Sequence, residues 1–181
     1  MQTLLRPLGD GRLSQLLRER GGHTLYDASR LLAALPYGRP AGSEPEALLI
    51  EGRGTCSSKH ALFVSVCREA GVPARLLVGF FLMTGANVPG VEAALAEAGL
   101  EGIWEAHCVA SLPDGVLDIT GLPSGASAIE LQDVIELAPE AIAAKAELHR
   151  SALGRWAARS ETRRSVADLW SIRERCIAAL A

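Results

Sequence analysis

The stretch from Glu51 to Arg75, EGRGTCSSKHALFVSVCREAGVPAR, constrains the fold more than any other part of the chain. It begins with a glycine-bearing turn, places Cys56 at the head of an apolar-periodic run, and ends with Gly71 before Val72-Pro73. A glycine after the last apolar position, with a proline shortly beyond it, is typical of a helix end. The sequence therefore predicts a mostly buried helix over residues 57–70, with Cys56 at its N-terminal end.

The segments on either side of this helix predict a mixture of helices and strands. Two short helical segments precede it, followed by a long connection over residues 36–55 that is rich in turn-forming residues. A near-continuous apolar run and a later pair of segments around Pro113-Asp114-Gly115 have strand-like composition. The expected elements are helices over 12–20, 27–35 and 88–99, strands over 74–83 and within 104–120, and helices from about residue 139.

A chain of 181 residues is long enough to bury a real hydrophobic core. We expect an α+β fold, in which the cysteine-bearing helix packs on a small antiparallel sheet, with N-terminal and C-terminal helices around it. Residues 1–138 are expected to form this domain, and residues 139–181 a helical extension packed on the same domain.

Neither the cysteines nor the apolar runs suggest export, a metal site or a membrane span. The four cysteines form no C-x-x-C pair, which disfavours a zinc framework or a dithiol redox motif. No apolar run approaches the roughly 18 residues that a membrane span requires. We therefore expect a cytoplasmic protein with no cofactor and no bound metal.

Charge is unevenly distributed along the chain. The net charge is −3, and residues 145–181 carry 8 basic and 4 acidic side chains, which leaves −7 for residues 1–144. The arginines of the C-terminal part alternate with acids and apolar residues at helical spacing, so a solvated helix face is favoured over nucleic-acid binding. A protein partner that contacts the C-terminal helices is an alternative hypothesis.

Cys56 is either a reactive thiol or a buried structural one. Cysteine reacts as the thiolate, and the unpaired amides at a helix N-terminus lower the pKa of a thiol placed there. A nucleophilic thiol also needs a base within hydrogen-bond reach and a third group that orients the base. His60 lies one turn along the same helix and is expected to serve as a core or supporting residue, whereas His107 in a strand is the better base.

Asp118 is the candidate for the group that orients His107. With a two-residue turn at Asp114-Gly115, Asp118 faces Ser111 and stands about 13 Å from His107 along the strands, too far to interact. With a four-residue loop over residues 112–115, Asp118 faces Val109 and His107 becomes its diagonal neighbour at about 7 Å. We predict the wider loop, or a bulge that brings the two side chains equally close.

At this point the chain resembles a known family. The segments GRGTCSSKHALFVSVCREAGVPARLLVGFF and EAHCVASLPDGVLDIT are similar to the transglutaminase-like superfamily, a branch of the papain-like cysteine fold. The resemblance spans about residues 44–120. It implies Cys56 as the nucleophile, His107 as the general base and acid, and Asp118 as the residue that orients the imidazole.

The resemblance also implies a reaction. It suggests a cysteine-dependent hydrolase or acyltransferase that acts on amide bonds of a peptide or peptide-like substrate through a thioester. Acyl transfer to a small molecule stays open, as does a non-catalytic protein-binding module of the same fold. Substrate, acceptor and oligomeric state are not encoded in recognisable motifs.

The chain departs from the family pattern at several positions. Val109 stands where the family often has an aromatic residue, and Val116-Leu117 stand where a tryptophan often precedes the aspartate. No glutamine before Cys56 is placed to donate to an oxyanion, so Tyr37, Arg53 and the backbone are the candidates for that role.

Overall fold

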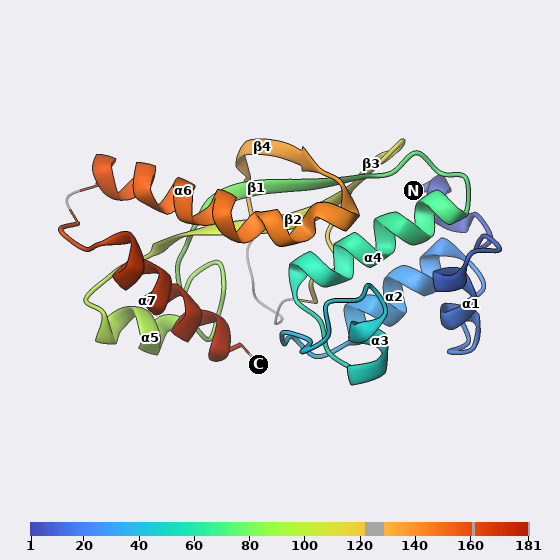
Figure 1. Cartoon of the computed structure of the whole chain (residues 1–181), viewed down its shortest axis with the longest axis horizontal. Helices are drawn as coiled ribbons and strands as arrows, with labels where there is room; N and C mark the ends of the chain where they lie inside the picture. The colour runs from blue at the N-terminus through green and yellow to red at the C-terminus, as the bar shows by residue number, and fades with distance from the viewer. Residues whose placement is uncertain (122–128, 161, 181) are drawn as a thin grey trace. The chain divides into compact units, whose positions relative to one another are not determined.

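The computed structural model describes residues 1–121, 129–160 and 162–180, and its elements are drawn in Figure 1. The helices and strands divide into two compact units. Unit 1 comprises residues 1–78, 108–121 and 135–142, and unit 2 comprises residues 79–107, 122–134 and 143–181. The elements in chain order are η1 (Gln2–Leu5), α1 (Arg12–Arg18), α2 (Leu25–Ala34), α3 (Ala47–Glu51), α4 (Cys56–Glu69), β1 (Arg75–Met83), α5 (Glu92–Glu97), β2 (Ile103–Leu112), β3 (Gly115–Leu117), β4 (Gln132–Leu137), η2 (Pro139–Ala144), α6 (Lys145–Arg159) and α7 (Val166–Ala178).

The expected α+β fold is confirmed. Four strands form one antiparallel sheet in the order β3-β2-β1-β4, and α4 packs on this sheet. The expected helices and three of the strands are present with boundaries shifted by a few residues. Strand β4 and the short helix α3 were not expected from the sequence. The division of the chain at residue 138 stays a prediction.

The register of β2 and β3 is the predicted one. Ala110 pairs with Leu117, Ser111 with Val116, and Leu112 with Gly115. Continued by one residue, this register places position 118 opposite position 109, as the wider loop requires. The loop itself is shorter than predicted, because Leu112 and Gly115 already pair and only Pro113 and Asp114 lie between the strands.

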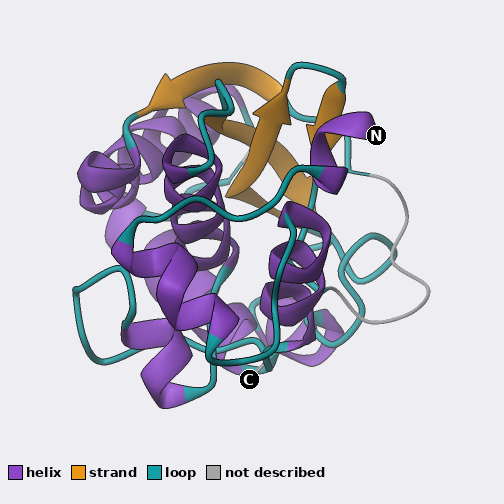
Figure 2. Ribbon diagram, turned by 90° about the vertical axis from the view of Figure 1, so that its right-hand side faces the viewer, coloured by secondary structure: helices purple, strands orange, loops and turns teal. Residues whose placement is uncertain are grey.

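Unit 1 is built around α4. Helices α1 and α2 both contact α4. Figure 2 draws the helices in purple and the strands in orange. Most residues of α4 are buried, and Phe63, Val64 and Cys67 have no exposed surface. The helix ends where Gly71 adopts a left-handed backbone with φ of 67°, a conformation that only glycine adopts at no steric cost.

Unit 2 contains the C-terminal helices. Helix α7 packs against both α5 and α6, with Leu153 and Leu169 fully buried. A charged pair is also buried here: the guanidinium of Arg173 donates two hydrogen bonds, of 2.7 and 2.8 Å, to the carboxylate of Glu105. Such a pair is tolerated in an interior because each charge satisfies the other.

No helix within the described ranges is long and apolar enough to cross a membrane.

Candidate functional site

Cys56 is the first residue of α4, and its local sequence explains this position. The hydroxyl of Thr55 accepts a hydrogen bond from the Ser58 amide, and the Ser58 hydroxyl accepts one from the Thr55 amide at 2.9 Å. This reciprocal arrangement is a capping box, which fixes where a helix begins. The thiol therefore lies at the positive end of the helix dipole, where the first-turn amides favour a thiolate. Cys56 is 4% exposed.

His60 is held in one tautomer by two backbone groups. Its Nδ1 lies 2.7 Å from the carbonyl oxygen of Cys56, and its Nε2 lies 2.9 Å from the amide nitrogen of Ile119. A carbonyl accepts and an amide donates, so Nδ1 carries the proton and Nε2 offers its lone pair. Both ring nitrogens of His60 therefore have backbone partners, and its expected role as a core or supporting residue stays a prediction.

Asp118 lies directly after β3 and is oriented by its neighbour. Its Oδ1 accepts hydrogen bonds from the Thr120 amide at 2.9 Å and from the Thr120 hydroxyl at 2.6 Å. The same oxygen lies 3.5 Å from Nε2 of His60. The side chain of Asp118 is 39% exposed, so one part of the carboxylate faces solvent. Within unit 1, His60 thus connects the turn that carries Cys56 to the segment that carries Asp118.

His107 lies on β2, in the part of that strand that belongs to unit 2. It is 5% exposed, and its ring contacts Phe81 edge-to-face, with centroids 6.0 Å apart. Cys56 and Asp118 belong to unit 1. The roles of Cys56, His107 and Asp118 therefore stay a prediction, which is developed below.

The other cysteines are buried thiols. Burial raises the pKa of Cys67 to about 12 and also raises the pKa of Cys176. Cys108 has no exposed surface, and its sulfur lies 3.7 Å from the Ser57 hydroxyl, which in turn lies 3.8 Å from the sulfur of Cys56. Cys67 and Cys108 are thus core residues.

The segment that leads to Cys56 is paired with the chain after α2. The amide of Gly54 donates to the carbonyl of Pro36, and the amide of Gly38 donates to the carbonyl of Gly54. The backbone of Tyr37 is therefore close in space to the segment that precedes Cys56. The guanidinium of Arg53 binds Glu51 at 3.2 Å.

Lys59 is a site residue that sequence reasoning missed. Its side chain is fully buried one turn after Cys56, and its ammonium donates to two backbone carbonyls. A signal was available: only two of the 18 basic residues are lysines, and both are buried. Every other basic side chain is an arginine, so lysine occurs in this chain only at these two buried positions.

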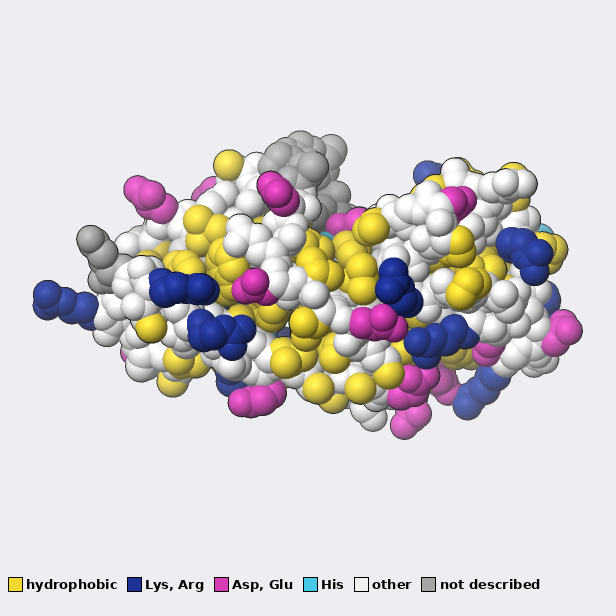
Figure 3. Space-filling view, turned by 90° about the horizontal axis from the view of Figure 1, so that it is seen from above, with side chains coloured by type: hydrophobic (Ala, Val, Ile, Leu, Met, Phe, Trp, Pro, Cys, Tyr) yellow, Lys and Arg dark blue, Asp and Glu magenta, His cyan; other side chains and the backbone are white. Residues whose placement is uncertain are grey.

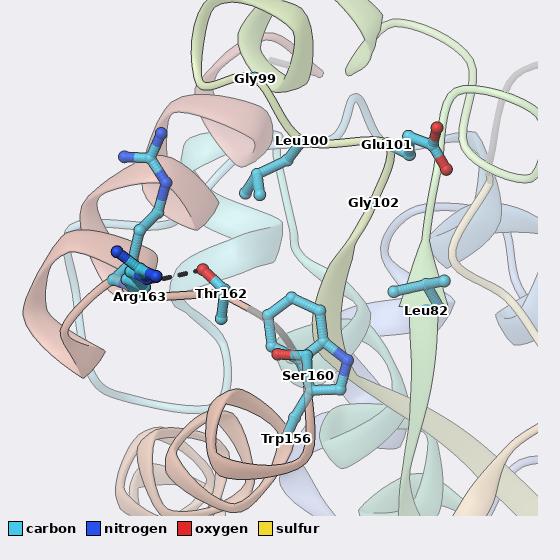
Figure 4. Close-up of a pocket in the computed structure, with 10 residues that line it drawn as sticks. Leu82, Gly99, Leu100, Glu101, Gly102, Trp156, Ser160, Thr162 and Arg163 are labelled. Carbon is cyan, nitrogen blue, oxygen red and sulfur yellow. Dashed lines mark hydrogen bonds between the residues drawn. The ribbon is translucent and has the colours of Figure 1, made fainter.

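A pocket in unit 2 offers a different surface. Figure 4 shows Leu82, Leu100 and Trp156 beside the polar side chains of Thr162 and Arg163. The pocket is open, and none of the candidate catalytic residues lines it. Trp156 lies here half-buried.

Several of the C-terminal arginines have partners inside unit 2. On the face drawn in Figure 3, basic and acidic side chains are interspersed. Several arginines are occupied inside unit 2: Arg173 binds Glu105, Arg164 donates to the Ala98 carbonyl, and Arg150 lies 4.0 Å over the ring of Trp170. Among the described residues there is no group of three side chains that could hold a metal ion.

One comparison with known proteins identifies a relationship. A family model described as the transglutaminase-like superfamily matches residues 9–113, which is more than half of the chain. The match includes Cys56 and His107, and Asp118 lies five residues beyond its end. No curated protein and no solved structure matches the chain significantly.

Proposed function

The chain belongs to the transglutaminase-like superfamily, and from this premise we propose that it is a cysteine-dependent hydrolase or acyltransferase. Its substrate would be a peptide or a peptide-like amide, and the reaction would pass through a thioester on Cys56. The observation that carries this proposal is the position of Cys56 as the first residue of a capped helix, in the unit that also holds Asp118. The cytoplasmic location stays a prediction.

His107 is proposed as the general base and acid. Of the four histidines, His60 has both ring nitrogens occupied by backbone groups, and buried His149 bonds to the carbonyl of Trp104. His23 lies exposed in a loop. This leaves His107 as the histidine whose position on β2 fits the family pattern.

Asp118 is proposed to orient the imidazole of His107. The register of β2 and β3 supports this pairing, because its continuation puts Asp118 opposite Val109, two residues from His107 on the same strand. Side chains in such diagonal positions are separated by about 7 Å at the backbone and are within reach of each other when one is an imidazole. Thr120 holds one carboxylate oxygen of Asp118 in place.

The mechanism follows from these roles. His107 takes the proton from the Cys56 thiol, and the thiolate attacks the carbonyl carbon of the amide. Backbone amides of the first turn of α4 are placed to stabilise the resulting oxyanion. His107 then gives its proton to the departing amine, which leaves a thioester on Cys56. Water or an acceptor amine, deprotonated by His107, attacks the thioester and releases the thiol.

One observation favours the alternative, a non-catalytic protein-binding module. Cys56 and His107 are 4% and 5% exposed, so a substrate carbonyl reaches the sulfur only if neighbouring side chains move. A buried thiol with no route to substrate would serve packing alone.

Acyl-enzyme trapping separates the two functions. Treatment with p-nitrophenyl acetate is expected to release p-nitrophenolate in a burst and to leave one acetyl group on Cys56, which hydroxylamine removes. Cys56→Ala should abolish the adduct, and His107→Gln or Asp118→Asn should slow its formation by about 10² to 10⁴-fold. Cys176→Ala is the matched control and should react as the native chain does.

Two outcomes of acyl-enzyme trapping would count against an enzyme. An adduct that persists in Cys56→Ala, or a native chain that acquires none at the peptide bearing Cys56, would contradict the enzymatic proposal and leave the binding module.

A further inference from the structure

The ammonium of Lys59 makes hydrogen bonds in addition to the packing contacts of its helix. Lys59 is among the largest of the fully buried side chains that the structure describes, and it lies three residues after Cys56 on α4. A lysine is almost never fully buried unless its charge is compensated, since moving an ammonium out of water is costly. The groups around its nitrogen therefore indicate what the side chain does.

Two carbonyl oxygens from distant parts of the chain accept from the ammonium. Nζ lies 2.6 Å from the oxygen of Leu35, at the end of α2, and 2.7 Å from the oxygen of Thr120, two residues after Asp118. These distances are short for N–H···O bonds, as expected when the donor is charged. Lys59 therefore ties α4 to the end of α2 and to the segment that carries Asp118.

Glycines allow the chain to approach Lys59 closely. A Cβ at Gly54 would lie 2.9 Å from Cγ of Lys59. A Cβ at Gly121 would lie 3.5 Å from Nζ and 2.4 Å from the carbonyl oxygen of Ala33, and Gly121 has a left-handed backbone with φ of 72°. The backbone is thus shaped around the side chain on both sides.

The charges near the ammonium are those of the candidate site. Burial lowers the pKa of Lys59, and attraction to Cys56 and Asp118 opposes that lowering. Because electrostatic attraction is mutual, a protonated Lys59 stabilises a thiolate on Cys56 and a carboxylate on Asp118. Both short bonds run to carbonyl acceptors, so the nitrogen is the donor in each of them.

We propose that Lys59 is a positioning residue of this site. Its buried ammonium fastens the segment carrying Asp118 to the helix carrying Cys56, and it keeps a positive charge beside the sulfur and the carboxylate. His60, the next residue, fastens the same segment by accepting from the Ile119 amide. The catalytic consequence rests on the proposed function, whereas the fastening and the electrostatic coupling can be measured without any substrate.

Hydrogen exchange in matched variants tests the fastening. Lys59→Met keeps the aliphatic stem and removes the ammonium, and Lys145→Met makes the same change at the other buried lysine, in unit 2. In Lys59→Met we expect the amide of Ile119 to exchange at least about tenfold faster, while the amides of residues 62–66 inside α4 keep their protection. Lys145→Met should leave Ile119 unchanged. A folded Lys59→Met with native protection at Ile119 would overturn the fastening.

Nitrogen NMR on the native sequence tests the electrostatic coupling and does not depend on the folding of Lys59→Met. Protein labelled with ¹⁵N at lysine Nζ has only two such signals, assigned with Lys145→Arg. The Lys59 signal is expected to shift with pH at the same midpoint at which Cys56 becomes alkylatable, and to lose that shift in Cys56→Ser. A Lys59 signal with the same pH profile in the native chain and in Cys56→Ser would overturn the coupling.

The two proposals fail in different ways. If Lys59 responds to Cys56 and protects Ile119 but no acyl group is ever trapped, the enzymatic function fails and the positioning role stands. If acylation occurs and neither measurement involves Lys59, the positioning role fails and the function stands.

Discussion

Removing Arg173 from its buried pair with Glu105 should destabilise unit 2 strongly. The two side chains are 8% and 6% exposed and share two charge-assisted hydrogen bonds. Arg173→Met fills similar space but leaves a buried carboxylate with only His149 and Lys145 nearby to compensate it. Breaking such a pair costs about 3–5 kcal/mol, because the remaining charge stays out of water. Arg150→Met, which removes an exposed arginine stacked on Trp170, is the control and should cost at most about 1 kcal/mol.

The dependence of this loss on pH has a defined sign. In the native chain burial acts to raise the pKa of Glu105, but the charges of Arg173, His149 and Lys145 outweigh it and lower the pKa. The pair therefore stabilises the fold above the ordinary glutamate pKa and loses its effect as pH falls through the lowered pKa. Without Arg173, burial dominates and the pKa rises, so the variant should recover part of its stability as the pH is lowered from about 7 to about 5.

Urea unfolding followed by tryptophan fluorescence is the appropriate assay, since Trp104, Trp156 and Trp170 all belong to unit 2. Ellipticity at the same urea concentrations reports on both units. The double variant with Glu105→Gln should lose less than the sum of the two single losses, by about 2 kcal/mol. A loss below about 1 kcal/mol for Arg173→Met, or a loss that grows as the pH falls, would refute this reasoning.

Three further substitutions test local features by urea unfolding followed by ellipticity. The hydroxyl of Ser14 is buried and has no hydrogen-bond partner among the described residues, so Ser14→Ala should stabilise the chain by about 1 kcal/mol. Ser29→Ala removes a hydroxyl that is hydrogen-bonded and should destabilise the chain. If both substitutions changed the free energy of unfolding in the same direction, this reasoning would be contradicted. Thr55→Ala should cost about 1 kcal/mol through loss of the cap at Cys56, with Thr55→Ser close to native, and a neutral Thr55→Ala would be the contrary result. Gly121→Ala should cost at least about 1 kcal/mol because its Cβ would meet the Ala33 carbonyl, and native stability would show that the backbone adjusts there.

The features that could be predicted from the sequence are those specified by residues nearby in the chain. The start of α4 at Cys56 follows from Thr55 and Ser58, and its end follows from Gly71 before a proline. The register of β2 and β3 followed from testing two turn lengths against the reach of a histidine and a carboxylate. These signals lie within a few residues of the element that they specify.

Strand β4 could not be predicted because it lacks the usual pattern. Its residues are mostly exposed, and Asp133 interrupts the extended backbone with φ of 48°. A strand that is exposed along nearly its whole length and has an irregular backbone shows no clear alternation of apolar and polar residues. Helix α3 is too short, at five residues, to show a period.

The contacts that support the site could not be predicted from the sequence for a different reason. Lys59 bonds to the carbonyls of Leu35 and Thr120, and His60 bonds to the carbonyl of Cys56 and the amide of Ile119. Backbone groups are the same at every residue, so a side chain that binds only backbone leaves no matching partner in the sequence. Only the rarity of lysine in this chain marks the position.

Alkylation of the native protein by iodoacetamide, with each cysteine followed by mass spectrometry, tests most directly whether Cys56 is an activated nucleophile. At about pH 6 we predict that Cys56 is modified first and faster than the thiol of an unstructured peptide, because a helix N-terminus and a nearby ammonium favour the thiolate. Cys67, whose pKa burial raises to about 12, should stay unmodified until the chain unfolds. Modification of Cys56 no faster than the peptide thiol would contradict the claim that this residue is built to react.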